Sequence, residues 1–97
     1  MSCYLYLIKT VDAFKVGCTT NPKKRFKAYK THNPLQTLEG LIEVVHNRVE
    51  KAVHIAILRR GYRKFPQRQE WFIGNLTLED FTKLVEEEND YWKKFYA

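Results

Sequence analysis

One helical segment of the sequence places a guanidinium close to a docking surface. Residues three and four apart share a face of a helix, so Arg25, Phe26 and Tyr29 lie together if residues 22–31 are helical. Phe26 and Tyr29 are the large apolar groups that could dock this segment, so Arg25 would point toward the protein. A guanidinium held in this way binds carboxylate or phosphate through its planar fork. The alternative is a solvated charge within the basic run 23–27, and position alone favours that alternative.

A second pair of residues could bind a cation. Glu50 and His54 lie four residues apart on a predicted helix, beside its apolar stripe. A carboxylate at the mouth of a cleft could hold a hard divalent cation. The pair does not predict a zinc site, because it contains one histidine and no cysteine pair lies nearby. A surface glutamate beside a solvated histidine is the alternative, and spacing alone favours it.

A third pair lies in the first eighteen residues. Tyr6 and Lys15 fall on two segments predicted to form a β-hairpin, and if they pair across it their side chains project from the same face. A phenol beside an ammonium ionises more readily, which makes Tyr6 a candidate base. A lysine facing solvent from an amphipathic strand is the ordinary alternative for Lys15.

Local patterns predict the elements that carry these residues. Aromatic and aliphatic runs predict strands, and apolar residues at helical spacing predict helices. The predicted strands are 3–8, 13–18 and 38–46, with a short extended segment at 70–73, and the predicted helices are 22–31, 47–60 and 77–95. Residues 62–65 are ambiguous. The order β-β-α-β-α-(β)-α predicts an α+β fold, in which about three helices flank a small, mostly antiparallel three-stranded sheet.

Capping residues set the predicted helix boundaries. Asn21 can cap the first helix, with Pro22 at its first position, and Pro34 should end it at Asn33. Asn47 should cap the second helix, whose buried stripe is Val49, Ala52, Val53 and Ala56. The run 77–80 resembles a capping box for the third helix, which should pack through Phe81, Leu84 and Val85.

Charge is distributed unevenly along the 97 residues, whose net charge is +6. Residues 1–68 hold 14 Lys/Arg against 4 Asp/Glu, and residues 69–97 hold 3 against 7. A basic body with an acidic last helix suggests a polyanionic partner for the first two thirds of the chain. Charge alone leaves an incidental basic surface equally open.

The remaining composition indicates one domain, residues 1–97, in a reducing compartment. A chain of this length fits one domain. The two cysteines, Cys3 and Cys18, are too few for a secreted scaffold and are expected to be unbridged apolar thiols. The apolar run 4–8 is too short for a signal peptide, and no segment approaches the length of a membrane span. We therefore expect an intracellular protein without a membrane partner, in a host cell if its origin is viral.

Taken together, these residues resemble the GIY-YIG nuclease superfamily over positions 3–75. Tyr4-Leu5-Tyr6 stands at the GIY motif and Lys15-Val16-Gly17 at YIG. Arg25 follows Gly17 by eight residues, as the family's arginine does, and Tyr29 stands at a His or Tyr position. Glu50 falls on the second helix, where the family carries its metal-binding glutamate. The run 70–72, Glu-Trp-Phe, is similar to the closing segment of a phage and fungal branch.

Two positions depart from the family pattern. Tyr4 replaces the first glycine of GIY, and Lys15 replaces the tyrosine of YIG. The second change gives a KIG-type variant, which occurs in the phage-like branch and in some restriction nucleases of the superfamily. A role that needs a second phenol is therefore not carried over to Lys15.

The resemblance implies a single GIY-YIG-like domain that hydrolyses phosphodiester bonds of nucleic acid, with DNA as the expected form. It implies that Glu50 binds Mg²⁺ or Mn²⁺, that Tyr6 is the general base and that Arg25 stabilises the transition state, with Lys15 and Tyr29 in support. His54 and Asn75 are additional candidates. The basic residues expected to hold the flanking backbone are Lys23, Lys24, Lys27, Lys30, Arg59, Arg60, Arg63 and Lys64.

Two other classes of function stay open at this point. A non-catalytic binding module would keep the basic face and lose the chemistry, which the changes at Tyr4 and Lys15 would then reflect. An interaction protein would instead use the acidic, aromatic tail 86–96. A small nuclease without a recognition domain would need a homodimer or a separate specificity partner for high sequence specificity.

Overall fold

The structure is a computed structural model that describes residues 3–32, 36–68 and 70–96, with the side chains of 28–32 left outside the description. The predicted α+β class is confirmed. The elements in chain order are β1 Cys3–Lys9, β2 Ala13–Thr19, α1 Pro22–His32, β3 Thr37–Val44, α2 Arg48–Arg59, β4 Arg63–Lys64, β5 Trp71–Ile73 and α3 Leu78–Tyr96.

The strands form a single antiparallel sheet in the order β3-β1-β2-β5-β4. The three long strands were predicted, and β1 lies between β2 and β3. Two short strands extend the sheet beyond β2. The ambiguous segment 62–65 contains one of them, β4, which pairs with β5 through Arg63 and Lys64.

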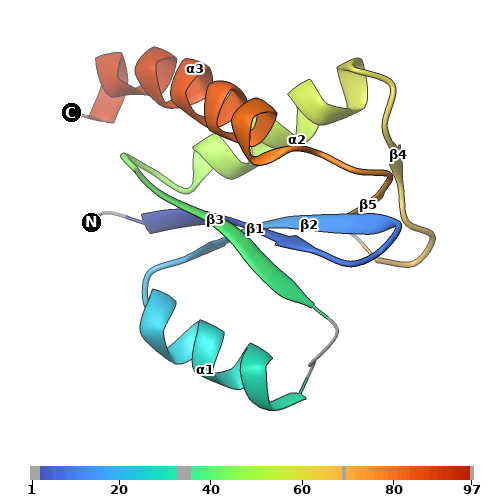
Figure 1. Ribbon diagram of the computed structural model, residues 1–97. Coiled ribbons are helices and arrows are strands. Elements are labelled where there is room, and N and C mark those ends of the chain that lie inside the picture. Colours follow the sequence, from blue (N-terminus) through green and yellow to red (C-terminus); the bar gives the residue numbers. More distant parts are fainter. Residues whose placement is uncertain (1–2, 33–35, 69, 97) are drawn as a thin grey trace.

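The helices lie on both faces of this sheet. Figure 1 shows α1 against one face and both α2 and α3 against the other. Leu5, Leu7, Phe14 and Val16 belong to the core that the sheet shares with α2 and α3. Side chains alternate between the faces of a strand, so Tyr6, Ile8 and Lys15 project toward α1, and Gly17 lies on the same face. The α1 side chain of Phe26 meets Tyr6 edge-on, with ring centroids 5.6 Å apart.

The core is apolar and lies mainly between the sheet and the pair α2–α3. The buried residues of α2 are Val49, Val53 and Ile57, and Ala52 and Ala56 of the predicted stripe are half-buried. The buried residues of α3 are Phe81, Leu84 and Val85, as predicted. Full burial of a large aliphatic or aromatic side chain contributes about 1.5–3 kcal/mol, so this layer holds α2 in place.

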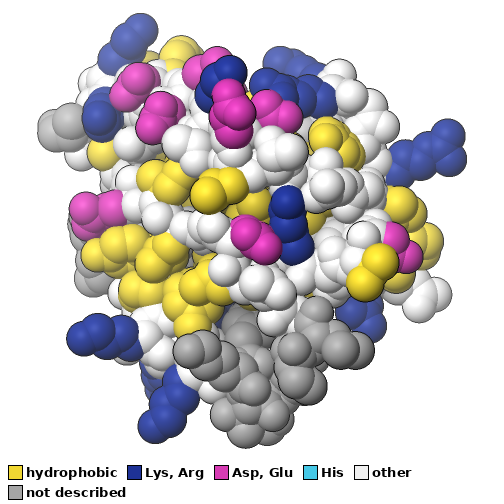
Figure 2. Space-filling model, in the orientation of Figure 1, with side chains coloured by type: hydrophobic (Ala, Val, Ile, Leu, Met, Phe, Trp, Pro, Cys, Tyr) yellow, Lys and Arg dark blue, Asp and Glu magenta, His cyan; other side chains and the backbone are white. Residues whose placement is uncertain are grey.

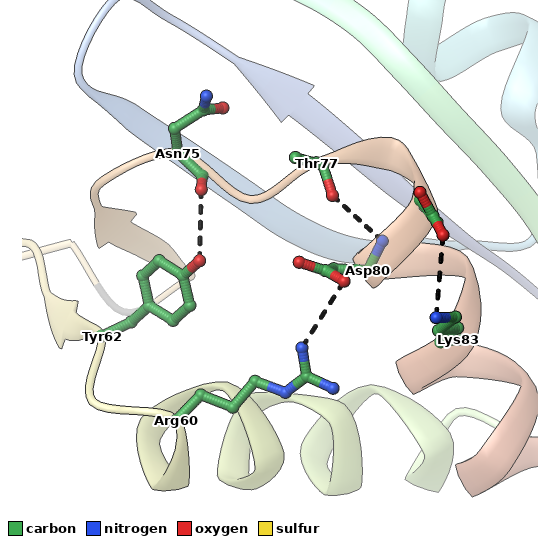
Figure 3. Close-up of polar contacts among 7 residues, drawn as sticks. Arg60, Tyr62, Asn75, Thr77, Asp80 and Lys83 are labelled. Carbon is green, nitrogen blue, oxygen red and sulfur yellow. Dashed lines mark hydrogen bonds and ion pairs between the residues drawn. The ribbon is translucent and has the colours of Figure 1, made fainter.

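Two of the three predicted helix caps are confirmed. The Asn21 Oδ1 atom accepts a hydrogen bond from the Lys24 N–H at 3.2 Å, and Pro22 opens α1. The Thr77 Oγ1 atom accepts one from the Asp80 N–H at 3.1 Å (Figure 3). The predicted end of α1 at Asn33 and Pro34 lies outside the described residues.

Asn47 occupies the N-cap position of α2, as predicted, but the capping hydrogen bond expected from its side chain is not formed. This residue has helical φ and ψ of −67° and −15°, whereas a side-chain cap requires an extended conformation. Its side chain makes no capping bond. The Nδ1 atom of His46 accepts the Arg48 N–H instead, at 3.1 Å.

Charge is distributed unevenly between the helices. In Figure 2 acidic side chains gather over α3, and lysine and arginine project over α1. The charged residues of α1 are all basic, whereas α3 carries six Asp and Glu residues. Among the described helices, none combines the length and the apolar character needed to cross a membrane.

Candidate active site at the open edge of β2

The outer edge of β2 is only partly covered by its neighbour. Strand β5 pairs with β2 from Ala13 to Lys15, and the Val16 N–H then donates to the Glu70 carbonyl at 3.3 Å. Beyond that bond no strand among the described residues pairs with this edge of Gly17–Thr19. We call this segment the open edge of β2. Helix α1 can reach it from one face of the sheet and α2 from the other (Figure 1).

Tyr6 lies across Gly17, its direct partner on β2. A Cβ atom built on Gly17 would lie 2.3 Å from the Tyr6 Oη and 2.4 Å from its Cζ. Any side chain at position 17 would therefore displace the phenol. The glycine allows the ring to extend over β2 toward the open edge. The Tyr6 side chain is fully buried there.

Two cations lie over the Tyr6 ring. The Lys15 Nζ is 5.8 Å from the ring centroid and the Arg25 Cζ is 5.9 Å from it. Lys15 pairs directly with Ile8 and so sits diagonal to Tyr6, which corrects the direct pairing considered from sequence. The prediction that both side chains share a face is confirmed. Arg25 is exposed, whereas the Lys15 side chain is only 14% exposed.

Glu70 fixes the position of Lys15. Its Oε2 lies 3.4 Å from the Lys15 Nζ, and its backbone is held by Val16. In the sequence Glu70 is marked only by the closing segment 70–72, and it was not among the predicted functional residues. Its place depends on the pairing of β5 with β2, which joins residues more than fifty positions apart, so only the Glu-Trp-Phe run could have marked it.

Glu50 comes to the same region from α2 and is partly buried. Burial and the nearby Glu70 carboxylate raise its pKa, and the charges of Lys15, Arg25 and Lys51 act in the opposite direction. Lys15 and Arg25 thus lie over the Tyr6 ring and also act on the Glu50 carboxylate. The structure therefore brings side chains from β1, β2, α1, α2 and the segment before β5 to one region.

His54 connects α2 to β2. A carbonyl oxygen only accepts hydrogen bonds, so the His54 Nε2–H donates to the Val16 carbonyl, at 2.7 Å. The ring meets Phe72 at a centroid distance of 5.3 Å. Burial lowers the pKa of His54, and the bond to Val16 opposes this shift. The Nε2 atom is thus occupied by the hydrogen bond to β2. In the neutral ring only Nδ1 remains free to accept a hydrogen bond or to bind a metal ion.

Asn75 lies at the other end of β2. It follows Gly74, whose N–H donates to the Asp12 carbonyl in the β1–β2 turn. The Asn75 carbonyl accepts a bond from the Tyr62 hydroxyl at 3.1 Å (Figure 3). Since a strand rises about 3.3 Å per residue, roughly 13 Å of β2 separates Ala13 from Gly17. The structure does not bring Asn75 to the open edge.

The predicted phosphate-binding cations occupy two regions. Lys23, Lys24 and Lys27 are exposed on α1, and the side chains of Tyr29 and Lys30 lie outside the described part. Lys64 lines a groove of about 360 Å³ together with Glu50, His54 and Glu70. The remaining cations are exposed near the end of α2, and they are Arg59, Arg60 and Arg63. Arg60 forms an ion pair with Asp80 at 3.8 Å (Figure 3).

The residues available to a metal ion are few. Within the described ranges, no group of three or more His, Cys, Asp or Glu side chains could enclose one. At the open edge a second carboxylate, Glu70, lies near Glu50 and raises its pKa. Mg²⁺ commonly takes one or two carboxylates and completes its shell with water and phosphate, so this donor set suits that ion.

Comparison with known proteins gives the family. The model of the T5orf172 domain matches residues 3–89, a span that runs from the start of β1 into α3 and contains every side chain of the open edge. The chain belongs to the T5orf172 domain family. No curated protein and no solved structure matches the chain.

Membership in the T5orf172 family gives the function in outline. The T5orf172 domain is phage-derived and associated with nuclease-type modules and nucleic acid. The chain therefore has a nuclease-like or nucleic-acid-binding character. That character agrees with the basic α1 and with the cations that surround the open edge.

Proposed function

We propose that this T5orf172 domain is a metal-dependent endonuclease of the GIY-YIG type, acting on nucleic acid and on DNA in particular. The observation that carries the proposal is the meeting of a phenol, a guanidinium and a carboxylate at the open edge of β2. Tyr6 comes from the hairpin, Arg25 from α1 and Glu50 from α2. The same two cations, Lys15 and Arg25, act on both Tyr6 and Glu50.

Glu50 would hold one Mg²⁺ or Mn²⁺. The fit rests on electrostatics, because the Glu70 carboxylate disfavours the ionised form of Glu50 and a divalent cation between the two would relieve that repulsion. When bound, such an ion neutralises charge on the scissile phosphate and on the leaving oxygen. Glu70 could supply a further oxygen, once Lys15 turns from it toward the phosphate.

Tyr6 would accept the proton of the attacking water. Its burial means that a covering group must move first, and Arg25 is the exposed cover. Arg25 would bind a phosphate at the open edge more strongly than it binds the face of an aromatic ring, because the phosphate is charged and accepts hydrogen bonds. Transfer of Arg25 from the ring to the phosphate would uncover the phenol and place a guanidinium where negative charge develops.

Lys15 would favour the phenolate form of Tyr6, because its ammonium lies close to the ring. Tyr29 would orient the water or bond a phosphate oxygen. The lysines of α1 would hold the flanking backbone, and such contacts carry little sequence information.

The test is cleavage of supercoiled plasmid by the purified full chain with Mg²⁺ or Mn²⁺. We expect nicking that chelator abolishes and that Glu50→Ala and Tyr6→Phe each reduce by at least about 10²-fold. Glu43→Ala, an exposed glutamate of β3, is the matched control and should cleave normally. Cleavage that survives both site substitutions would overturn the roles given to Glu50 and Tyr6.

A second candidate is a non-catalytic nucleic-acid-binding module. It is favoured by the complete burial of Tyr6, which leaves no phenolic surface for water in this conformation. It predicts binding that weakens steeply with salt and needs no metal, with no strand cleavage under any metal condition. The plasmid assay and a salt titration of binding therefore distinguish the two candidates.

A further inference from the structure

A large cavity adjoins the candidate active site on the α2 side of the sheet. Its volume is about 930 Å³, and it extends along the open edge from Glu50 and Glu70 to Trp92 of α3. Ligand-binding pockets in proteins span roughly 300–1,000 Å³. The proposed cleavage chemistry uses only the end at Glu50 and Glu70, so most of this space has no assigned role.

The cavity has apolar walls. Cys3 and Cys18 come from the first two strands, Ala52 and Ile55 from α2, and Trp92 provides an aromatic surface. Both thiols are free. Burial and the neighbouring Cys3 raise the pKa of Cys18 to about 12, so that its thiol is uncharged at neutral pH. Such walls suit a planar, weakly polar group such as a nucleobase.

Polar and cationic groups complete the lining of the cavity. Thr19, Thr20 and Asn47 offer hydroxyl and amide groups, which can both donate and accept hydrogen bonds as base edges require. Arg48 and Lys51 are exposed cations at the start of α2. The lining therefore combines an apolar wall, neutral hydrogen-bonding groups and positive charge, which is the combination that recognises a nucleotide.

The position of the cavity links it to the strand being cut. Glu50 and Glu70 belong both to its lining and to the open edge. A nucleotide in the cavity would therefore adjoin a phosphate held at Glu50. A base within a duplex is stacked and paired, so it can enter a pocket only if it is unpaired or flipped out.

We propose that this cavity binds one unpaired nucleotide of the strand that is cut, next to the scissile phosphate. The inference rests on the proposed function, because the cavity shares Glu50 and Glu70 with that site. It names the substrate class as nucleic acid with a single-stranded nucleotide at a junction, an overhang or a bulge. Fully paired duplex would bind only through its phosphates.

The experiment measures binding in EDTA, where cleavage cannot occur. Fluorescein-labelled DNA hairpins are compared by anisotropy, one with a blunt end and one with a four-nucleotide overhang. We expect the full chain to bind the overhang at least tenfold more tightly than the blunt hairpin. Ile55→Trp should remove this preference, because the larger ring would enter the cavity, and should leave affinity for the blunt hairpin within twofold.

The controls separate filling of the cavity from loss of the fold. Ile55 is 51% exposed and lines the cavity, so an indole can enter the cavity there without overpacking the buried core. Leu58→Trp is the matched control on the same helix, because Leu58 is also exposed and does not line this cavity. It should keep the preference. Asn47→Leu is a second test, which removes a hydrogen-bonding amide without adding a large ring and should lower the preference by at least threefold.

The outcomes distinguish this inference from the proposed function. Equal binding of the two hairpins by the wild type, or an overhang preference that survives Ile55→Trp and Asn47→Leu, would overturn the cavity proposal. Such a result would leave metal-dependent plasmid cleavage intact. Conversely, an overhang preference that Ile55→Trp abolishes would support nucleotide binding in the cavity, even if the plasmid assay shows no cleavage.

Discussion

Gly17 leaves the space that the Tyr6 phenol occupies. The two residues are direct partners across β1 and β2, and a Cβ at position 17 would lie 2.3 Å from the phenolic oxygen. The need for glycine at the third position of the Lys15-Val16-Gly17 motif is thus explained by its packing against Tyr6 of the Tyr4-Leu5-Tyr6 motif. The positions of Lys15 and Arg25 over the ring depend on the same contact.

The first prediction concerns this contact. Gly17→Ala should destabilise the protein by about 1–3 kcal/mol, because the ring must leave an overpacked position. Urea unfolding followed by circular dichroism measures the change. In a Tyr6→Leu background the same substitution should cost much less, since the clashing atoms are gone. An equal cost in both backgrounds would show that the ring is not the cause.

The second prediction concerns the two carboxylates at the open edge. Glu70→Gln should lower the pKa of Glu50, because the Glu70 charge raises it in the wild type. Carbon-13 NMR titration of the Glu50 carboxyl group reports this value directly. Glu43→Gln, which removes an exposed carboxylate of β3, is the control and should leave the titration unchanged. A Glu50 titration curve unaltered by Glu70→Gln would contradict the coupling.

The third prediction concerns stability and activity at Glu50. Its pKa is raised above the ordinary value of 4.5, so the folded state binds more protons than the unfolded state above that pH. Stability contributed by this group is therefore present at low pH and falls as pH rises through the raised pKa. Glu50→Gln should stabilise the protein at pH 7 by about 0.5–2 kcal/mol while abolishing cleavage, a trade-off common at functional sites.

Melting temperature as a function of pH measures the effect of Glu50→Gln. The gap between Glu50→Gln and wild type should close as the pH falls below 4.5, where Glu50 is protonated in both states. A gap that is independent of pH would show that the charge of Glu50 is not what destabilises the wild type. A less stable Glu50→Gln variant at pH 7 would contradict the prediction outright.

The fourth prediction concerns His54. Its pKa is lowered from the ordinary value of 6.5, so the unfolded state binds more protons as the pH falls below that value. Its contribution to stability is therefore complete above pH 6.5 and is lost as the pH falls toward the lowered pKa. His54→Leu should remove this dependence.

The same substitution has a cost at every pH. The Val16 carbonyl loses its bond from the His54 ring, and an unsatisfied buried acceptor costs about 1–3 kcal/mol. Nitrogen-15 NMR of the wild-type ring should show the Nε2–H tautomer at pH 7. The opposite tautomer would contradict the assigned bond.

Local sequence signals predicted the elements but not all of their contacts. Asn21, Pro22 and Thr77 mark helix starts through bonds that span three residues, so the sequence alone sufficed. Asn47 stands at the N-cap position and has the right chemistry, but its helical backbone does not favour the side-chain bond, and the Arg48 N–H donates to the His46 ring instead. Residue type predicts a cap only when the backbone conformation is also known.

Long-range pairing limited what the sequence could predict for the site. The short strands β4 and β5 carry too few residues for a clear pattern, and their pairing with β2 is what places Glu70 beside Lys15. The burial of Tyr6 was also not predicted, because it depends on Phe26 and Arg25 of α1 packing over the ring. Motif order predicted which residues meet, and packing determined how accessible they are.

The separation of charge between two helices on opposite faces of the sheet has a consequence for how the molecule approaches a partner. Helix α1 carries only basic charge and α3 is mostly acidic, so the protein has a permanent electric dipole across the sheet. The field of a polyanion exerts a torque on this dipole, which turns α1 toward the polyanion and α3 away from it before any contact is made. Because screening at physiological ionic strength acts over about 8 Å, this alignment would operate only during the final approach.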